Sequence, residues 1–292
     1  MDNTQNKKRI YFADLTHTIN GVHTPTFPLG VSYVASYAKE NLGTNFEIRL
    51  FRFPDDLAKA IIETPPQVIA LSNYSWNLEL GYELCSWAKK LNPNIISVFG
   101  GPNFPIVPEE KTQFLNWYKN IDFFIELEGE IGFVELVKKL ELFDFDIEKL
   151  KISQESINNC TYLSDSRLIK GLSERVNDLN EIPSPYLTGM LDDFFDYPLL
   201  PMMETTRGCP FSCAFCADGL TIKNKVRRFD IDRTKAEIDY ICERVQDIDE
   251  IIITDLNFGM YKEDVAIAQY IAEVQKEKNW PIIVNASAGK NK

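Results

Sequence analysis

Three cysteines that stand within eight residues carry the strongest chemical signal in the sequence. Cys209, Cys213 and Cys216 have the spacing C-x3-C-x2-C in the segment ETTRGCPFSCAFC, which begins at Glu204. Thiolates are the usual protein ligands of iron–sulfur clusters, and three this close can hold one cube of four irons. Three ligands leave one iron open, so that a substrate or cofactor can bind it. The spacing therefore predicts an iron–sulfur centre with a vacant position.

Two other interpretations of the cysteine segment stay open. A structural zinc site needs four ligands, but the segment has no fourth Cys or His nearby. A thioredoxin-like Cys213-x-x-Cys216 pair would leave Cys209 without a role. The remaining cysteines, at positions 85, 160 and 242, lie in ordinary contexts and are expected to be small buried hydrophobes.

The composition is that of a globular protein with about two domains. Of 292 residues, 45% are hydrophobic and 25% charged, and the formal net charge is -12. An acidic chain has no basic footprint for nucleic acid or anionic lipid. The polar N-terminus is unlike a signal peptide, and no apolar run approaches the ~20 residues of a membrane span. We therefore expect a soluble cytoplasmic protein without membrane or nucleic-acid partners.

The first half, residues 1–142, alternates strand-like runs with helical patterns. Such alternation indicates an α/β domain with a flavodoxin-like, doubly wound parallel sheet. The predicted strands are Arg9–Ala13, Phe46–Phe51, Val68–Ser72, Ile95–Phe99 and Asp122–Ile125. The predicted helices are Leu29–Asn41, Asp56–Glu63, Leu78–Leu91 and Ile131–Leu140. Ligands of such sheets bind at the carboxyl ends of the strands, in the loops Asp14–Gly30, Asn73–Asn77, Gly100–Pro108 and Glu126–Glu130.

The pattern becomes irregular over residues 143–198, which we interpret as a connector with a small hairpin near Thr161–Lys170. A second α/β series occupies residues 199–292. It comprises a strand into Thr206, the cysteine loop, helix Arg233–Val245, strand Glu250–Thr254, helix Lys262–Lys278 and strand Pro281–Asn285. Three strands and two helices are fewer than a barrel needs and leave the last strand unpaired on one side. We therefore expect an incomplete (β/α) barrel in a truncated chain.

The cysteine segment resembles the radical S-adenosylmethionine (SAM) superfamily, in the spacing of its three cysteines and in the Arg-Gly-Cys-Pro context of Arg207–Pro210. The resemblance implies a 4Fe-4S cluster on Cys209, Cys213 and Cys216. It also implies SAM bound at the open iron, and reductive cleavage of SAM to a 5′-deoxyadenosyl radical that takes hydrogen from a substrate. Residues 199–292 would then be the N-terminal part of a radical SAM core.

The same resemblance suggests residues that contact SAM. An aromatic residue before the third cysteine, here Phe215, would lie against adenine, and Asp255 and Asn257 would bind the amino-acid or ribose part. Asn285 and Ser287, at the end of the third strand, are further candidates. Phe215 could equally be a core residue, and Asp255 and Asn257 could simply cap a turn or a helix after their strand.

Three runs in the first half resemble the cobalamin-binding-type domain that precedes many radical SAM cores. They are PLGVSYVASYA from Pro28, VFGGPN from Val98 and ELEGE from Glu126. The glycines of the second run lack a Cβ and permit close approach of a bulky cofactor, although a plain strand-to-helix turn explains them as well. The residues that we expect to bind cobalamin are Leu29, Ser72, Ser75, Gly100, Gly101, Glu128 and Gly129.

One departure concerns the Asp-x-His-x-x-Gly motif that supplies a cobalt ligand in many cobalamin domains. Here the loop reads Asp14-Leu-Thr-His17-Thr-Ile-Asn20, so that the His comes one position late and Asn replaces Gly. The motif is not met, and many cobalamin-dependent radical SAM proteins lack this ligand. Direct sequence evidence for cobalamin is therefore missing, and without the cofactor the domain would recognise substrate or pack on the core.

The leading hypothesis is a cobalamin-dependent radical SAM methyltransferase that acts on a small-molecule or biosynthetic-intermediate substrate. An electron donor such as flavodoxin or ferredoxin would reduce the cluster. A radical SAM enzyme of another class (rearrangement, ring formation or methylthiolation) without cobalamin is the second hypothesis, and a non-catalytic cluster-binding module is the third. No single residue is assigned as catalytic.

Overall fold

The computed structural model describes residues 7–289. The chain forms two compact units. The first comprises residues up to Thr24 together with Gly30–Val176, and the second comprises Pro25–Leu29 together with the chain from Asn177. The short segment Pro25–Leu29 thus belongs to the second unit, where Thr26 pairs with Leu200 and the ring centroids of Phe27 and Phe195 lie 4.9 Å apart.

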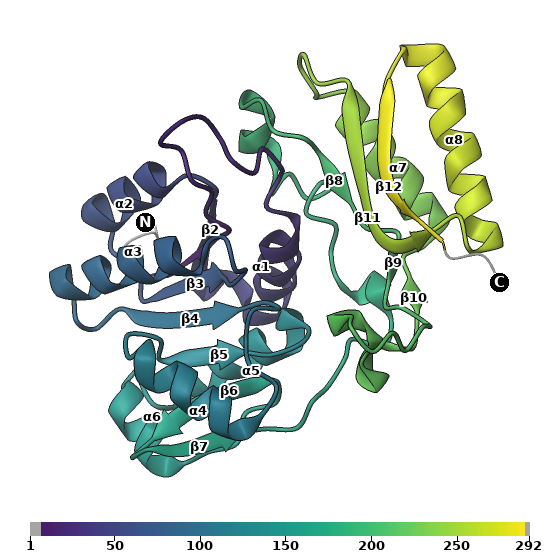
Figure 1. The fold of residues 1–292 in the computed structure, drawn as a ribbon. Helices are drawn as coiled ribbons and strands as arrows, with labels where there is room; N and C mark the ends of the chain where they lie inside the picture. The colour runs from purple at the N-terminus through teal and green to yellow at the C-terminus, as the bar shows by residue number, and fades with distance from the viewer. Residues whose placement is uncertain (1–6, 290–292) are drawn as a thin grey trace. The chain divides into compact units, whose positions relative to one another are not determined.

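The first unit is built on a seven-stranded sheet in the order β2-β1-β3-β4-β5-β6-β7 (Figure 1). Its five parallel strands are β1 (Lys8–Ala13), β2 (Phe46–Phe51), β3 (Val68–Ser72), β4 (Ile96–Gly100) and β5 (Phe123–Ile125). Their order confirms the predicted flavodoxin-like, doubly wound sheet. Every residue of β3 is buried, and its first four residues are apolar without alternation, as is typical of a strand that is covered on both faces.

Helices cover both faces of this sheet. They are α1 (Leu29–Leu42), α2 (Pro54–Glu63), α3 (Leu78–Leu91), α4 (Pro108–Trp117) and α5 (Gly129–Leu142). Leu57 of α2, Cys85 of α3 and Phe114 of α4 share one core cluster with the side chains of one sheet face. On the other face, Phe12 of β1 packs against Phe133 of α5, with ring centroids 4.6 Å apart.

The residues that we expected to form a connector, 143–198, are divided between the two units. A short helix α6 (Ile147–Ser153) and the hairpin of β6 (Cys160–Ser164) and β7 (Arg167–Lys170) complete the first sheet. The predicted hairpin is confirmed, and β6 pairs antiparallel with β5. The rest of the segment packs in the second unit and includes η3 (Leu179–Glu181) and η4 (Asp192–Asp196).

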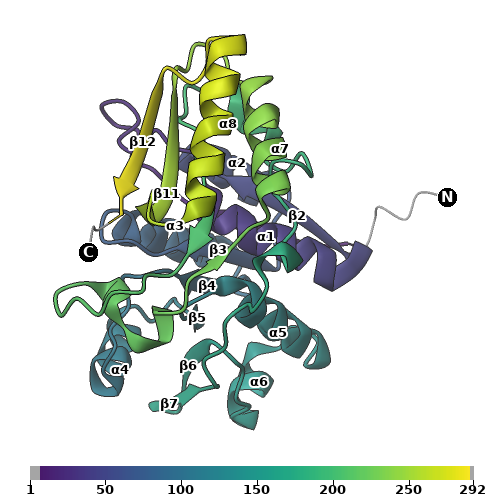
Figure 2. The ribbon, with the colours of Figure 1, turned by 90° about the vertical axis from the view of Figure 1, so that its right-hand side faces the viewer.

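The second unit contains three parallel strands in the order β12-β11-β8. They are β8 (Met202–Met203), β11 (Glu250–Phe258) and β12 (Ile283–Ala288), connected through α7 (Ile231–Cys242) and α8 (Lys262–Lys278). Figure 2 shows α7 and α8 side by side against these strands. This β/α series is the partial barrel expected from the sequence. Within the described residues, β12 pairs only with β11 and its side chains are exposed.

The second unit also contains a two-stranded sheet, whose strands precede and follow the cysteine loop. We predicted one strand running into Thr206, but the chain leaves β8 after Met203 and forms a separate strand β9 (Thr206–Arg207). This strand pairs antiparallel with β10 (Arg227–Arg228), so that the cysteine loop is the loop of a hairpin. Two short helical turns, η5 (Ala217–Gly219) and η6 (Thr221–Lys223), lie within it.

Two of the three remaining cysteines are buried as expected. Cys85 and Cys160 are almost completely inaccessible, and burial raises the pKa of the Cys85 thiol to about 11. Cys242 is only partly buried. Among residues 7–289, no helix is long and apolar enough to span a membrane.

Candidate functional site

The cysteine loop is held together by its own backbone. The amide of Cys209 donates to the carbonyl oxygen of Lys223 over 3.0 Å, which ties the start of the loop to its far side. The amide of Cys216 donates to the carbonyl of Cys213, and the amide of Gly219 to that of Cys216. All three cysteines are free thiols; Cys209 is buried, and Cys213 and Cys216 are partly accessible. The loop therefore presents one inner and two outer thiols.

Two glycines permit this close folding. Gly208 has a φ of +111°, and a Cβ there would lie 2.6 Å from the carbonyl oxygen of Lys225. A Cβ on Gly219 would lie 2.5 Å from the carbonyl oxygen of Cys213. Real Cβ atoms do not approach backbone oxygens this closely, so both positions require glycine for steric reasons.

The carboxyl end of β11 meets the chain that leads into the loop. Asp255 is 1% exposed and accepts hydrogen bonds from the Thr205 amide (2.7 Å) and hydroxyl (2.5 Å) and from the Thr206 hydroxyl (2.6 Å). Burial raises the pKa of this carboxyl group, and the hydrogen bonds oppose the rise. Asp255 thus anchors Thr205 and Thr206, which precede the cysteines. The sequence had suggested a contact with SAM for Asp255 and gave no sign of this anchoring contact.

Asn257, two residues further along β11, reaches the first cysteine directly. Its side-chain Nδ2 donates to the Sγ atom of Cys209 over 3.2 Å. Its Oδ1 is buried and has no hydrogen-bond partner in the described part of the chain. Buried polar atoms are normally satisfied, so an orphaned oxygen beside a thiol marks a place where a further donor fits.

The other predicted SAM contacts lie on the surface of the unit. Phe215 is 93% exposed, so the alternative that it belongs to the core does not hold. Asn285 and Ser287 are exposed on β12, and the Asn285 amide donates to Glu250 over 2.8 Å. The structure therefore places Asp255 and Asn257 against the cysteine loop, whereas Phe215, Asn285 and Ser287 face solvent.

The donor set suits an iron–sulfur cluster. Three free thiols on one loop are the ligands that such clusters use, and an amide N–H aimed at a ligand sulfur is a common outer hydrogen bond. Within residues 7–289, no three His, Cys, Asp or Glu side chains are gathered closely enough to hold a single metal ion.

In the first unit, the carboxyl end of the sheet carries a polar network around Asp14. Its Oδ1 accepts from the Ser72 hydroxyl (2.5 Å) and the Asn77 amide (3.1 Å), and its Oδ2 pairs with the Arg52 guanidinium. Arg52 is 2% exposed and also donates to the carbonyl of Thr24 over 2.6 Å. Ser72, predicted to contact cobalamin, is thus engaged with the loop that follows β1.

The predicted glycines of this edge contact protein rather than open space. Gly101 has a φ of +136°, and its Cβ would lie 2.6 Å from the carbonyl oxygen of Asn73. A Cβ on Gly100 would lie 3.3 Å from the Ile125 carbonyl, and one on Gly129 would lie 2.7 Å from a Val34 methyl group. The close approach that these glycines allow is therefore an approach of the chain to itself.

The last three predicted cobalamin contacts differ in their surroundings. Glu128 is buried and accepts from the Arg175 Nε (2.7 Å) and the Val176 amide (2.8 Å). Ser75 is exposed on the β3–α3 loop. Leu29 is buried and is part of the second unit. Among the predicted cobalamin residues, Ser75 is therefore the clearest surface group.

An aromatic pair at the same edge was not singled out from the sequence. Tyr74 and Trp76 stack with ring centroids 4.5 Å apart and an interplanar angle of 11°, and Trp76 is 53% exposed. The His17 Nε2 lies 3.0 Å from the Trp76 carbonyl oxygen, so that the two loops meet there. The sequence did hold a sign of this pair, because Tyr74 and Trp76 stand at alternate positions in the predicted ligand-binding loop Asn73–Asn77.

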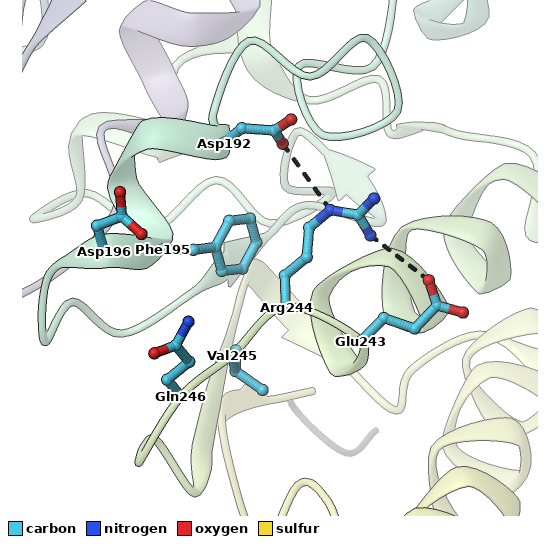
Figure 3. Close-up of a pocket in the computed structure, with 7 residues that line it drawn as sticks. All are labelled: Asp192, Phe195, Asp196, Glu243, Arg244, Val245 and Gln246. Carbon is cyan, nitrogen blue, oxygen red and sulfur yellow. Dashed lines mark hydrogen bonds and ion pairs between the residues drawn. The ribbon is translucent and has the colours of Figure 1, made fainter.

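A pocket elsewhere in the second unit collects none of the predicted site residues. It has a volume of about 370 Å³ and lies between η4 and the end of α7, where Arg244 is flanked by Asp192 and Glu243 (Figure 3). Its lining residues are Asp192, Phe195, Asp196, Glu243, Arg244, Val245 and Gln246. The cysteine loop is not part of this pocket.

Comparison with known proteins finds similar proteins that cover both halves of the chain. Residues 17–137 match the family described as the B12 binding domain. Over 97% of its length, the chain is 29% identical to 2-(S-pantetheinyl)-carbapenam-3-carboxylate methyltransferase of Streptantibioticus cattleyicolor. It is 28% identical, again over 97% of its length, to the cobalamin-dependent radical SAM methyltransferase TokK of Streptomyces tokunonensis. Over nearly its whole length the chain is thus similar to methyltransferases, one of which is a cobalamin-dependent radical SAM enzyme, and part of its first half matches the B12 binding domain.

Solved structures of radical SAM proteins share the fold. The cobalamin-dependent enzyme OxsB, solved with aqua-cobalamin and SAM, matches 92% of this chain with a TM-score of 0.62 and 21% identity. The methyltransferase TsrM of Kitasatospora setae matches 94% with a TM-score of 0.64 and 13% identity. The chain spans 41% of the length of each of the two curated relatives, 37% of OxsB and 52% of TsrM.

Proposed function

We propose that this chain provides the cofactor-binding part of a cobalamin-dependent radical SAM methyltransferase. Cys209, Cys213 and Cys216 hold a 4Fe-4S cluster, SAM binds at the open iron, and cobalamin binds at the carboxyl edge of the first sheet. The observation that carries the proposal is the hairpin loop with three free thiols, one of which accepts a hydrogen bond from Asn257. The family match over residues 17–137 and the names of the relatives support the cobalamin half.

The cofactors would supply the chemistry that protein side chains lack, namely one-electron cleavage of SAM and carriage of a methyl group. The chain's own residues bind and orient these groups. The two glycines let the loop fold tightly around its thiols, and Asp255 fixes the strand that enters it. Phe215, Asn285 and Ser287 are accessible side chains that can contact SAM.

In the first unit, the Asp14 network keeps the loop after β1 in place beside the β3–α3 loop. The exposed face of the Tyr74–Trp76 stack offers a flat apolar surface suited to a macrocycle. Ser75 can donate a hydrogen bond there. Ser72, Gly100, Gly101, Glu128 and Gly129 would act by shaping this edge. Leu29 lies in the second unit, and its contact with cobalamin stays a prediction.

The substrate class that we propose is a small organic molecule or biosynthetic intermediate, as the name of the first relative suggests. A flavodoxin or ferredoxin would supply the electron, in the cytoplasm. The net charge of -12 gives no reason to expect nucleic acid.

Anaerobic purification and reconstitution with iron and sulfide test the proposal. We expect about four irons per chain, a reducible EPR signal that SAM alters, and loss of the signal in the Cys209→Ala, Cys213→Ala, Cys216→Ala variant. Added hydroxocobalamin should bind with a change in its visible spectrum. A cluster that cleaves SAM without binding cobalamin would contradict methyl transfer, and a colourless zinc-containing protein would contradict the whole proposal.

A further inference from the structure

Two side chains on β11 act on the same stretch of chain. Because side chains alternate along a strand, Asp255 and Asn257 lie on one face of β11. Asp255 holds Thr205 and Thr206, and Asn257 contacts Cys209, two residues beyond the end of β9. Strand β11 therefore fixes both the approach to the cysteine loop and its first thiol.

The contact with the thiol is enclosed. Asn257 is 5% exposed and Cys209 is 7% exposed, so water does not compete freely for the sulfur. A thiolate can only accept hydrogen bonds, and the donor of an asparagine side chain is its NH₂ group. Once Cys209 binds iron, only the orientation with Nδ2 toward Sγ is favourable, as the structure has it.

We propose that Asn257 is a positioning residue for the cluster ligand Cys209, which orients the thiolate and raises the reduction potential of the cluster. An N–H···S hydrogen bond draws electron density from the ligand sulfur and stabilises the reduced state, in which the cluster carries more negative charge. The inference rests on the proposed cluster. It gives Asn257 a role that does not depend on SAM.

The sequence-based role for Asn257, a contact with SAM, makes a different prediction. A residue that only contacts SAM leaves the potential of the SAM-free cluster unchanged when it is replaced. A residue that donates to Cys209 changes that potential before SAM is added. The buried Oδ1 is free to accept from a bound ligand, so that SAM affinity is a second, separate readout.

The experiment is an EPR-monitored reductive titration of the reconstituted chain without SAM. Asn257→Leu removes the donor and keeps most of the volume, whereas Asn257→Ala removes the donor without the risk of overpacking. Gln246→Ala is the matched control, since it removes an exposed amide in the connection that precedes β11. Iron and sulfide content and circular dichroism report whether each variant folds and holds the cluster.

We expect both Asn257 variants to titrate at a more negative potential than the wild type, with altered g-values, and Gln246→Ala to titrate like the wild type. An unchanged potential in whichever Asn257 variant retains the cluster would overturn the inference, and so would a shift of the same size in the control. If the wild-type chain itself assembles no cluster, the proposed function fails instead. For the variants that retain the cluster, equilibrium dialysis with SAM shows whether Asn257 also contributes to SAM binding.

Discussion

Gly219 faces the backbone of Cys213 so closely that a Cβ would lie 2.5 Å from its carbonyl oxygen and 2.9 Å from its nitrogen. The two residues close the turn that carries the second and third thiols, with Cys216 between them in the hydrogen-bond chain. Any side chain at position 219 must therefore move Cys213.

We expect Gly219→Ala to lower the iron content after reconstitution while most of the protein stays folded. The clash falls on backbone, which cannot rotate away as a flexible side chain can, and overpacking of this kind costs about 1–3 kcal/mol. Iron and sulfide analysis with circular dichroism measures the effect. Gly30→Ala is the matched control because a Cβ there meets nothing within 4 Å. Full iron content in Gly219→Ala would show that the loop adapts.

Asp255 should matter for the stability of the second unit. Asp255→Ala leaves the Thr205 amide and two threonine hydroxyls without their buried acceptor, and each such group costs about 1–3 kcal/mol. We expect faster hydrogen–deuterium exchange in peptides that contain Thr205 and Thr206, as well as weaker cluster assembly. Asp249→Ala removes an exposed carboxylate just before β11 and should leave both unchanged. Equal exchange in the two variants would rule out the anchoring role.

Regular elements with strong apolar patterns could be predicted closely. The bounds of β2, β3, α3 and α8 are those expected from the sequence. Helix α4 was missed because most of its residues are polar, with Phe114 and Leu115 as its buried apolar side chains. Helix α6 has only seven residues, of which Leu150 alone is buried, and so it shows no helical period.

The site was predictable only as far as local spacing reaches. Three cysteines within one short segment reveal their chemistry without a fold, but the partner of Cys209 is 48 residues away in the sequence. Likewise, Asp255 looked available for a ligand because its three donors lie about fifty residues earlier. Gly101 appeared suited to a cofactor, although the space that it leaves is filled by Asn73 from another strand's loop. Such roles depend on tertiary contacts that single-sequence patterns do not encode.

The stability of the second unit should fall with rising pH because of Glu237. Burial raises the pKa of this carboxyl group above its ordinary value of 4.5, and the contacts with Arg233 and Ser184 oppose the rise. With a raised pKa in the folded state, the stabilising contribution is fully present below 4.5 and is lost as the pH rises through the folded pKa.

Glu237→Gln removes this titration. We expect the stability of the wild type relative to Glu237→Gln to decrease as the pH rises from about 4.5, measured by hydrogen exchange of α7 peptides after correction for the intrinsic rate. Glu243→Gln, an exposed replacement just beyond α7, is the control and should show no trend. If instead the wild type became more stable relative to Glu237→Gln as the pH rises, the ionised Glu237 carboxylate would be stabilising and the prediction would be wrong.

Arg52 should be essential for the order of the loop after β1. Its guanidinium is buried and binds the Asp14 carboxylate as well as the Thr24 carbonyl, at either end of the segment that carries His17 and His23. Removal of one partner of a fully buried ion pair costs about 3–5 kcal/mol, and the cost here should be smaller because the Asp14 side chain that remains is 19% exposed. We expect Arg52→Ala to destabilise the first unit measurably, to increase exchange in residues 14–24 and to weaken cobalamin binding. Lys149→Ala breaks the exposed pair with Asp146 and should leave the stability of the first unit nearly unchanged. If the two variants were equally stable, Asp14 would be held sufficiently by Ser72 and Asn77, and the loop would not depend on Arg52.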